Sequence, residues 1–182
     1  MEPRIWRGDL FLQERITRKL GATRMMLTDL GIKGESKTPS GINVHLIESD
    51  DITYVWDDIL PLIRVSLRYA EGELEPEDLV IHLDTGQMNL WVAMEKNEVI
   101  AAMITEIITY PRKRILRVIT LASKDGHGMD NWYDFLPMVE GFAINNGCSA
   151  LEAWTRKGMA RRLKDWKHSY SVITKDLKQR MQ

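Results

Sequence analysis

The most constraining feature of this sequence is a strand–turn–helix–strand pattern between Ile115 and Trp154. Residues 115–121 are a run of β-branched and apolar side chains, and residues 123–128 interrupt it with a turn that contains two glycines. Residues 132–146 then have the apolar spacing of a helix, and residues 150–154 predict a second short strand. Where such a turn leads into a helix, the free backbone N–H groups of the first helical turn and the positive end of the helix dipole point to the same place. The pattern therefore predicts a turn that can bind an anion.

The rest of the chain adds helices and a run of neighbouring strands. Short turns join three consecutive strands, which predicts antiparallel pairing in a meander. Pro61 is expected to kink or end the helix in which it lies. The other expected elements are strand 42–47, helices 52–60 and 75–83, strands 88–94, 99–109 and 114–122, a basic helix at 156–166 and a last strand at 170–174. The predicted fold class is α+β (mixed α/β).

The N-terminal part of the chain predicts an amphipathic helical arm at residues 9–30, or two helices that break at Gly21. Residues 31–41 follow as a linker. The apolar stripe of the arm comprises Leu12, Ile16, Leu20, Met26, Leu27 and Leu30. A lone helix cannot bury such a stripe, so the arm is expected to fold back on the domain, pair with another copy or dock on a partner. We therefore divide the chain into an arm with its linker, 1–41, and a domain, 42–182.

Charge is distributed unevenly along the sequence. Residues 1–40 carry 8 basic and 5 acidic side chains, residues 41–111 carry 3 and 14, and residues 112–182 carry 14 and 7. Two explanations stay open: the oppositely charged parts pack together, or the basic half binds an anion.

Composition also excludes several classes of protein. No apolar run approaches the roughly 18 residues that span a bilayer, and the first residues lack the apolar core of a signal peptide. We therefore expect no membrane partner and no secretion by a signal peptide. The single cysteine, Cys148, excludes an internal disulfide and is interpreted as a packing residue. The histidines show no metal-ligand spacing, so no metal site is predicted.

The order of the expected elements, from residue 42 to about residue 177, resembles the GNAT (N-acetyltransferase) superfamily. The best local matches are the hairpin 90–103 and the segment 147–175. The resemblance implies a three-layer fold with a mostly antiparallel central sheet that splays between strands 115–122 and 150–154. It further implies that acyl-coenzyme A inserts into the splay and rests its pyrophosphate on residues 123–129.

Under this resemblance the cofactor-binding residues are Ser123, Lys124, Gly126, His127, Gly128 and Met129. The family turn is (Arg/Gln)-x-x-Gly-x-(Gly/Ala), and this sequence keeps Gly-x-Gly but has Ser123 in the first position. Asp125 and Asp130 place two carboxylates where phosphates would approach, each of which disfavours the anion by about 1 kcal/mol near a surface. A plain tight turn is the alternative interpretation.

Amine acylation needs a base for the amine and an acid for the departing thiolate. Glu106 lies on a strand that often supplies the base in this family. The alternative interpretation is a polar side chain that points outward from a strand of alternating character. The family acid is commonly a tyrosine on the helix after the fifth strand, which here would be 156–166 and contains none. Tyr170, which follows it, is the substitute candidate.

Basic residues on the arm and in the last third of the chain form candidate partner-binding surfaces. They are Arg15, Arg18, Lys19, Arg156, Arg161, Arg162 and Lys164. For the cluster beyond residue 155, three interpretations compete: a solvated helix face, a site for an acidic protein surface, and a site for nucleic acid or coenzyme phosphate. We do not expect nucleic acid as the partner.

Two functional hypotheses follow. The first, which the substituted turn favours, is a GNAT fold with a degraded acyl-CoA site. It would serve as a structural or adaptor component of a phage particle, docked on protein partners through its arm and its basic half. GNAT-like proteins of tailed bacteriophages have this appearance, which implies a virion or host-cytoplasm location and no cofactor. The alternative is an active N-acetyltransferase that uses acetyl-CoA to modify a small-molecule amine.

Overall fold

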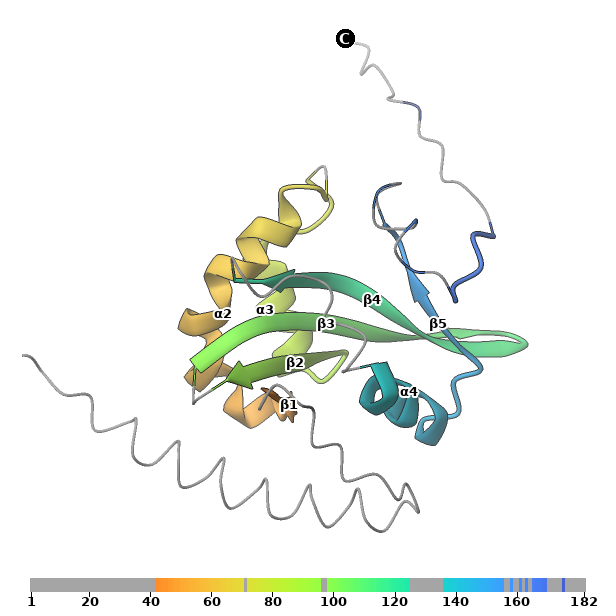
Figure 1. Cartoon of the computed structure of the whole chain (residues 1–182), viewed down its shortest axis with the longest axis horizontal. Helices are drawn as coiled ribbons and strands as arrows, with labels where there is room; N and C mark the ends of the chain where they lie inside the picture. The colour runs from red at the N-terminus through yellow and green to blue at the C-terminus, as the bar shows by residue number, and fades with distance from the viewer. Residues whose placement is uncertain are drawn as a thin grey trace, which may run out of the picture. The chain divides into compact units, whose positions relative to one another are not determined.

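A computed structural model describes residues 42–70, 72–95, 98–124 and 136–155, together with 158, 161, 163, 165–169 and 175. Five strands and several helices alternate along this part of the chain (Figure 1). In order they are β1 (Ile42–Ile47), the 3₁₀ turn η1 (Ser49–Asp51), α2 (Ile52–Leu67), α3 (Pro76–Asp84), β2 (Met88–Glu95), β3 (Glu98–Tyr110), β4 (Lys113–Ser123), α4 (Leu136–Asn145) and β5 (Ala150–Ala153). The predicted arm, 1–41, lies outside the described residues.

The strands form one sheet in the order β1-β2-β3-β4-β5. The first four strands pair antiparallel, with Leu46 opposite Trp91, Trp91 opposite Met103, and Met103 opposite Leu121, and β2, β3 and β4 form a meander. The predicted hairpins are therefore confirmed, and the fold class is α+β as expected. One irregularity lies in β4, where Ile104 pairs with Thr120 but Thr105 pairs with Val118.

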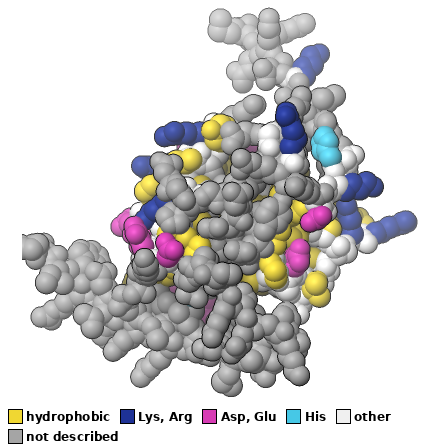
Figure 2. All heavy atoms as spheres, in the orientation of Figure 1, with side chains coloured by type: hydrophobic (Ala, Val, Ile, Leu, Met, Phe, Trp, Pro, Cys, Tyr) yellow, Lys and Arg dark blue, Asp and Glu magenta, His cyan; other side chains and the backbone are white. Residues whose placement is uncertain are grey.

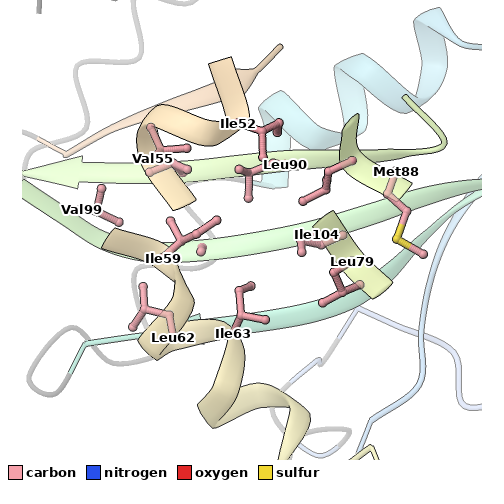
Figure 3. Packing of buried hydrophobic residues seen from close by; sticks show 13 residues of the cluster. Ile52, Val55, Ile59, Leu62, Ile63, Leu79, Met88, Leu90, Val99 and Ile104 are labelled. Carbon is pink, nitrogen blue, oxygen red and sulfur yellow. The ribbon is translucent and has the colours of Figure 1, made fainter. Parts of the chain in front are cut away.

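One face of the sheet is covered by α2 and α3, which bury the main apolar core. Figure 3 shows α2 side chains directed at the strands, with Ile59 and Ile63 near the centre of the cluster. Both side chains are fully buried, and Leu79 of α3 and Leu90 of β2 complete the same layer. The buried residues of α2 recur at positions i, i+3, i+7, i+10 and i+11 from Ile52, which explains why the sequence folds here as an amphipathic helix.

The opposite face of the sheet packs against α4. The Trp91 ring meets the Phe142 ring edge to face, with centroids 5.1 Å apart. Trp91 is buried, and its indole N–H donates a hydrogen bond to the Thr105 hydroxyl at 3.0 Å. Buried indole N–H groups need such a partner. The fold thus has the three layers that the sequence resemblance implies.

The end of α4 determines where β5 begins. Gly147 has φ of +72°, and the Cys148 N–H donates to the Ala143 carbonyl at 2.9 Å. Helices commonly end with a residue in the left-handed conformation, followed by a backbone N–H that bonds to a carbonyl of the last turn. Glycine adopts the left-handed conformation without strain. The turn brings Ser149 directly beside β4 and so starts β5.

Two sequence predictions need correction. Of the alternatives for Pro61, an end of the helix is wrong, because α2 continues to Leu67. Proline removes one intrahelical N–H, but Pro61 is exposed, so water can satisfy the carbonyl left over. The strand predicted at 150–154 ends at Ala153, and Trp154 is 57% exposed.

The chain divides into two units, residues 1–152 and 153–182. Few residues of the second unit are described. Among them Leu163 is buried and accepts a backbone hydrogen bond from Trp166 at 3.1 Å, whereas Arg161 is exposed. In the described part of the chain, no helix is both long and apolar enough to cross a membrane.

Candidate functional site

Strands β4 and β5 run in the same direction. The Ser149 N–H donates to the Arg114 carbonyl at 2.8 Å, and the Arg117 side chain contacts the Glu152 side chain at 2.7 Å. Both contacts join residues separated by 35 positions. A constant offset along two neighbouring strands means parallel pairing, with α4 on the crossover connection. The edge of the antiparallel meander is therefore extended by one parallel strand.

Strand β4 is much longer than the strand that borders it. Counting with the same offset of 35, Ala153 at the end of β5 lies level with Val118. Residues 119–123 of β4 therefore extend past β5 while remaining in the strand, which ends at Ser123. Their inner edge pairs with β3. Their outer edge carries backbone N–H and C=O groups that β5 does not pair, and we call this segment the open edge of β4.

A buried hydroxyl lies within this segment of β4. Thr120 is 5% exposed, and its Oγ1 has no hydrogen-bond partner among the described residues. Thr120 pairs with Ile104 of the main core, so its side chain lies on the face of the sheet that α2 and α3 cover. Thr105, on the neighbouring strand, accepts the indole hydrogen bond of Trp91. An unpaired buried hydroxyl destabilises a protein by about 1–3 kcal/mol.

A polar cluster joins β4 to β5 just before the open edge. The Arg117 Nε lies 2.7 Å from the Glu152 Oε1, with 16% and 17% of the two side chains exposed. The same guanidinium donates to the Tyr110 hydroxyl at 3.1 Å, and the Lys113 ammonium lies 5.2 Å from the centre of the Tyr110 ring. A half-buried charge-assisted bond is stronger than a neutral one, so this cluster holds the two strands together at one point.

Sequence reasoning missed this cluster. One signal was present, because Arg117 is a lone charge within the apolar run Ile115 to Leu121. A charged residue in a half-buried strand needs a partner. The identity of that partner, Glu152, depends on the parallel register, which no local pattern encodes.

The predicted base, Glu106, lies near this cluster. Glu106 is half-buried on β3, opposite Met88 on one side and Arg117 on the other. Directly paired residues share a face of the sheet, with Cβ atoms about 4.5–5.5 Å apart. Glu106 and Arg117 therefore share the face covered by α2 and α3, and a catalytic role for Glu106 stays a prediction. Tyr170, the predicted acid, lies outside the described residues.

Two of the predicted cofactor-binding residues are described. Ser123 is half-buried at the end of β4, opposite Ala101. The Lys124 N–H donates to the Ile100 carbonyl at 2.8 Å, and the Lys124 Nζ lies 2.6 Å from the Glu98 Oε1. This ion pair is exposed, so it contributes about 1 kcal/mol or less and is easily exchanged for another anion. Gly126, His127, Gly128 and Met129 lie outside the described residues.

The remaining predicted residues are mostly outside the described part of the chain. This holds for Arg15, Arg18, Lys19, Arg156, Arg162 and Lys164. Among the described residues, no group of three or more His, Cys, Asp or Glu side chains could hold a metal ion. Burial raises the pKa of the Cys148 thiol, against a smaller opposing effect of Arg114. A neutral buried thiol is a poor nucleophile, which supports a packing role for Cys148.

No protein-family model and no curated protein matches the sequence. Solved structures do match the fold. An aminoglycoside acetyltransferase from an uncultured soil metagenomic sample, in complex with sisomicin, gives a TM-score of 0.59 at 13% identity and covers 78% of this chain and 100% of its own. A GNAT family acetyltransferase of Staphylococcus aureus gives 0.56 at 15% identity, covering 75% and 99%.

A third match is a predicted acetyltransferase with acetyl-CoA from Clostridium acetobutylicum. Its TM-score is 0.54 at 14% identity, and the match covers 75% of this chain and 96% of the other. Each match spans nearly the whole of the other protein, and identities this low establish the fold alone. The chain therefore has the GNAT acetyltransferase fold, as its order of elements indicates.

Proposed function

We propose that this chain binds an acyl-coenzyme A along the open edge of β4 and transfers the acyl group to an amine. The observation that carries the proposal is the run of residues 119–123 beyond the end of β5. A strand edge that continues beyond its neighbouring strand offers backbone donors and acceptors in a row, which suits a ligand with amide groups along its length. The solved neighbours with acetyl-CoA and with sisomicin, an aminoglycoside, support the same donor and an amine acceptor.

The described residues fit such a ligand in two ways. The Thr120 hydroxyl has no partner among the described residues and lies on the face of β4 that α2 and α3 cover, so it can bond a polar group that reaches this face. Lys124 lies directly after the strand, and its only described ion pair is an exposed one with Glu98. Because this exposed pair is weak, the ammonium is available to a phosphate of the coenzyme.

The reaction itself needs few groups from the protein. The amine nitrogen forms a bond to the acyl carbon, the carbon–sulfur bond breaks, and the thiolate leaves with a proton from an acid. Glu106 would accept the proton that the amine loses, either directly or through one water. The Arg117–Glu152 pair would hold β4 and β5 at a fixed separation beside the reacting groups.

Binding and turnover test the proposal separately. Calorimetry of the full chain with acetyl-CoA should give a dissociation constant between about 1 μM and 1 mM, the usual range of KM values. Release of free thiol should then follow addition of polyamines, aminoglycosides or a lysine peptide. Coenzyme A without the acyl group is the control ligand and should release no new thiol. Absence of both heat and thiol release would reject the proposal.

A second candidate is the adaptor role, in which the acyl-CoA site is degraded and the protein is a component of a phage particle. It is favoured by Ser123, which replaces the arginine or glutamine of the family turn, and by the Lys124–Glu98 ion pair. Exposed basic residues such as Arg161 would then bind acidic protein surfaces. If the unmodified chain binds no acetyl-CoA and Ser123→Arg gains binding, this candidate replaces the first.

Thr120→Val is expected to raise the free energy of unfolding by about 1 kcal/mol, because it removes a buried hydroxyl without a partner. It should also weaken acetyl-CoA binding in calorimetry. Thr105→Val is the matched control on the adjacent strand, since its hydroxyl accepts the Trp91 hydrogen bond. This control should lower the free energy of unfolding by about 1–3 kcal/mol. Urea unfolding measures the free energy of unfolding of both variants. A change in the same direction for both would contradict the assignment of the Thr120 hydroxyl as unpaired.

A further inference from the structure

The outer face of α2 carries an exposed apolar stripe. Tyr54 is 53% exposed and Val65 is 44% exposed, and Pro61 between them is exposed too. Their spacings of seven and four residues place the three side chains on one face of the helix. We call these three residues the α2 stripe. The buried side of the same helix already faces the sheet, so the stripe is a second apolar face.

Charged side chains border the stripe. Asp57 and Asp58 are exposed and lie on either side of its N-terminal part by helical geometry. Arg64 and Arg68 are exposed too and lie beside its C-terminal part. The segment 48–87 as a whole carries 11 acidic and 2 basic side chains. Figure 2 shows acidic, basic and apolar side chains next to one another on the left side of the described residues, the side on which Figure 1 places α2. The excess of acidic side chains in segment 48–87 fits a basic amphipathic helix as the occupant of the stripe.

The chain itself contains a segment with that chemistry. Residues 9–30 combine an apolar stripe at helical spacing with the basic residues Arg15, Arg18, Lys19 and Arg24, against three acidic residues. The linker 31–41 has eleven residues and can extend about 36–40 Å. Helix α2, with 16 residues, is about 24 Å long. The linker, which ends directly before Ile42, where the described chain begins, can therefore span a distance longer than α2 itself.

We propose that residues 9–30 dock within the same molecule on the α2 stripe. The docked segment covers Tyr54 and Val65 with its apolar stripe, and its basic side chains face Asp57 and Asp58. The surface then has a defined occupant, and the arm no longer needs another copy or a separate partner for its apolar residues. The adaptor candidate would retain only the basic side chains beyond residue 155 for docking.

Disulfide crosslinking of the full chain tests where the segment lies. Ile16→Cys combined with Val65→Cys should form an intrachain disulfide about tenfold faster than Ile16→Cys combined with Ile144→Cys, because docking raises the effective concentration of one thiol at the other. Ile144 is the matched control, since it is 70% exposed on α4. Single-cysteine variants control for the native Cys148. Equal rates for the two pairs, or disulfide-linked dimers whose yield rises with concentration, would overturn the proposal.

Trypsin cleavage after Arg15, Arg18 and Lys19 gives a second measurement that needs no cysteine. Docking should slow cleavage, and Asp57→Asn combined with Asp58→Asn should speed it by about tenfold, as should about 0.5 M NaCl. Asp84→Asn is the control, because Asp84 is an exposed acid on α3. All three carboxylates are exposed, so these variants are expected to fold. Cleavage that is equally fast in the unmodified chain and the double variant overturns the proposal.

Discussion

Glu106→Gln is expected to lower kcat for amine acetylation by about 100-fold or more while KM changes little. A positioned general base contributes about 10²- to 10⁴-fold, and glutamine keeps the shape of the side chain but cannot accept the proton. Glu106 lies on β3, is half-buried and pairs with Arg117 of β4. Because glutamine and glutamate have the same shape, the substitution should leave the packing intact. Steady-state kinetics with the amine that gives the fastest release of thiol from acetyl-CoA measures the effect.

The control for this variant is Glu140→Gln, an exposed glutamate on α4. It should retain full activity. Circular dichroism and urea unfolding of both variants establish that the sheet is intact. If Glu106→Gln keeps kcat while Arg117→Ala abolishes it, the carboxylate is not the base, and the Arg117 cluster is the part of the site that matters.

Ile59→Ala should lower the free energy of unfolding by about 2–5 kcal/mol. The side chain is fully buried at the centre of the core between α2 and the sheet. Truncation loses the transfer free energy of the removed carbons and leaves a cavity that the packed strands cannot fill. Because native domains are stable by only about 5–15 kcal/mol, this variant is expected to lose a large share of its stability. Urea unfolding followed by tryptophan fluorescence provides the measurement.

Ile81→Ala makes the same chemical change at a residue of α3 that is 62% exposed. It should alter the free energy of unfolding by no more than about 0.5 kcal/mol. Similar losses in the two variants would mean that the core is not where the burial of Ile59 places it.

The antiparallel part of the fold could be predicted from local patterns. The expected strands 42–47, 88–94, 99–109 and 114–122 differ from β1 to β4 by at most one residue at either end. Alternating apolar residues and short turns encode such a meander directly. The helix through Pro61 was harder, because the tolerance of a proline depends on whether water reaches the carbonyl that it leaves unpaired.

The site was less accessible to sequence reasoning. Glu106, Ser123 and Lys124 were reached only through the resemblance of the element order to a family. The partner of Lys124 is Glu98, and the partner of Arg117 is Glu152, 35 residues away. The first pair arises from the antiparallel register of β3 and β4, and the second arises from the register across the crossover. Periodicity reports neither register. Thr120 could not be identified from the sequence either. A single threonine in a strand does not indicate whether its hydroxyl has a hydrogen-bond partner.

The parallel attachment of β5 also bears on how the molecule assembles. Short turns join β2, β3 and β4, whereas β1 reaches β2 across residues 48–87, which include α2 and α3, and bringing Ser149 to Arg114 closes a loop that includes α4. Loop closure over such a distance is entropically unfavourable and slow relative to a hairpin. We therefore expect β2, β3 and β4 to pair first, and the two outer strands, β1 and β5, to join the sheet afterwards.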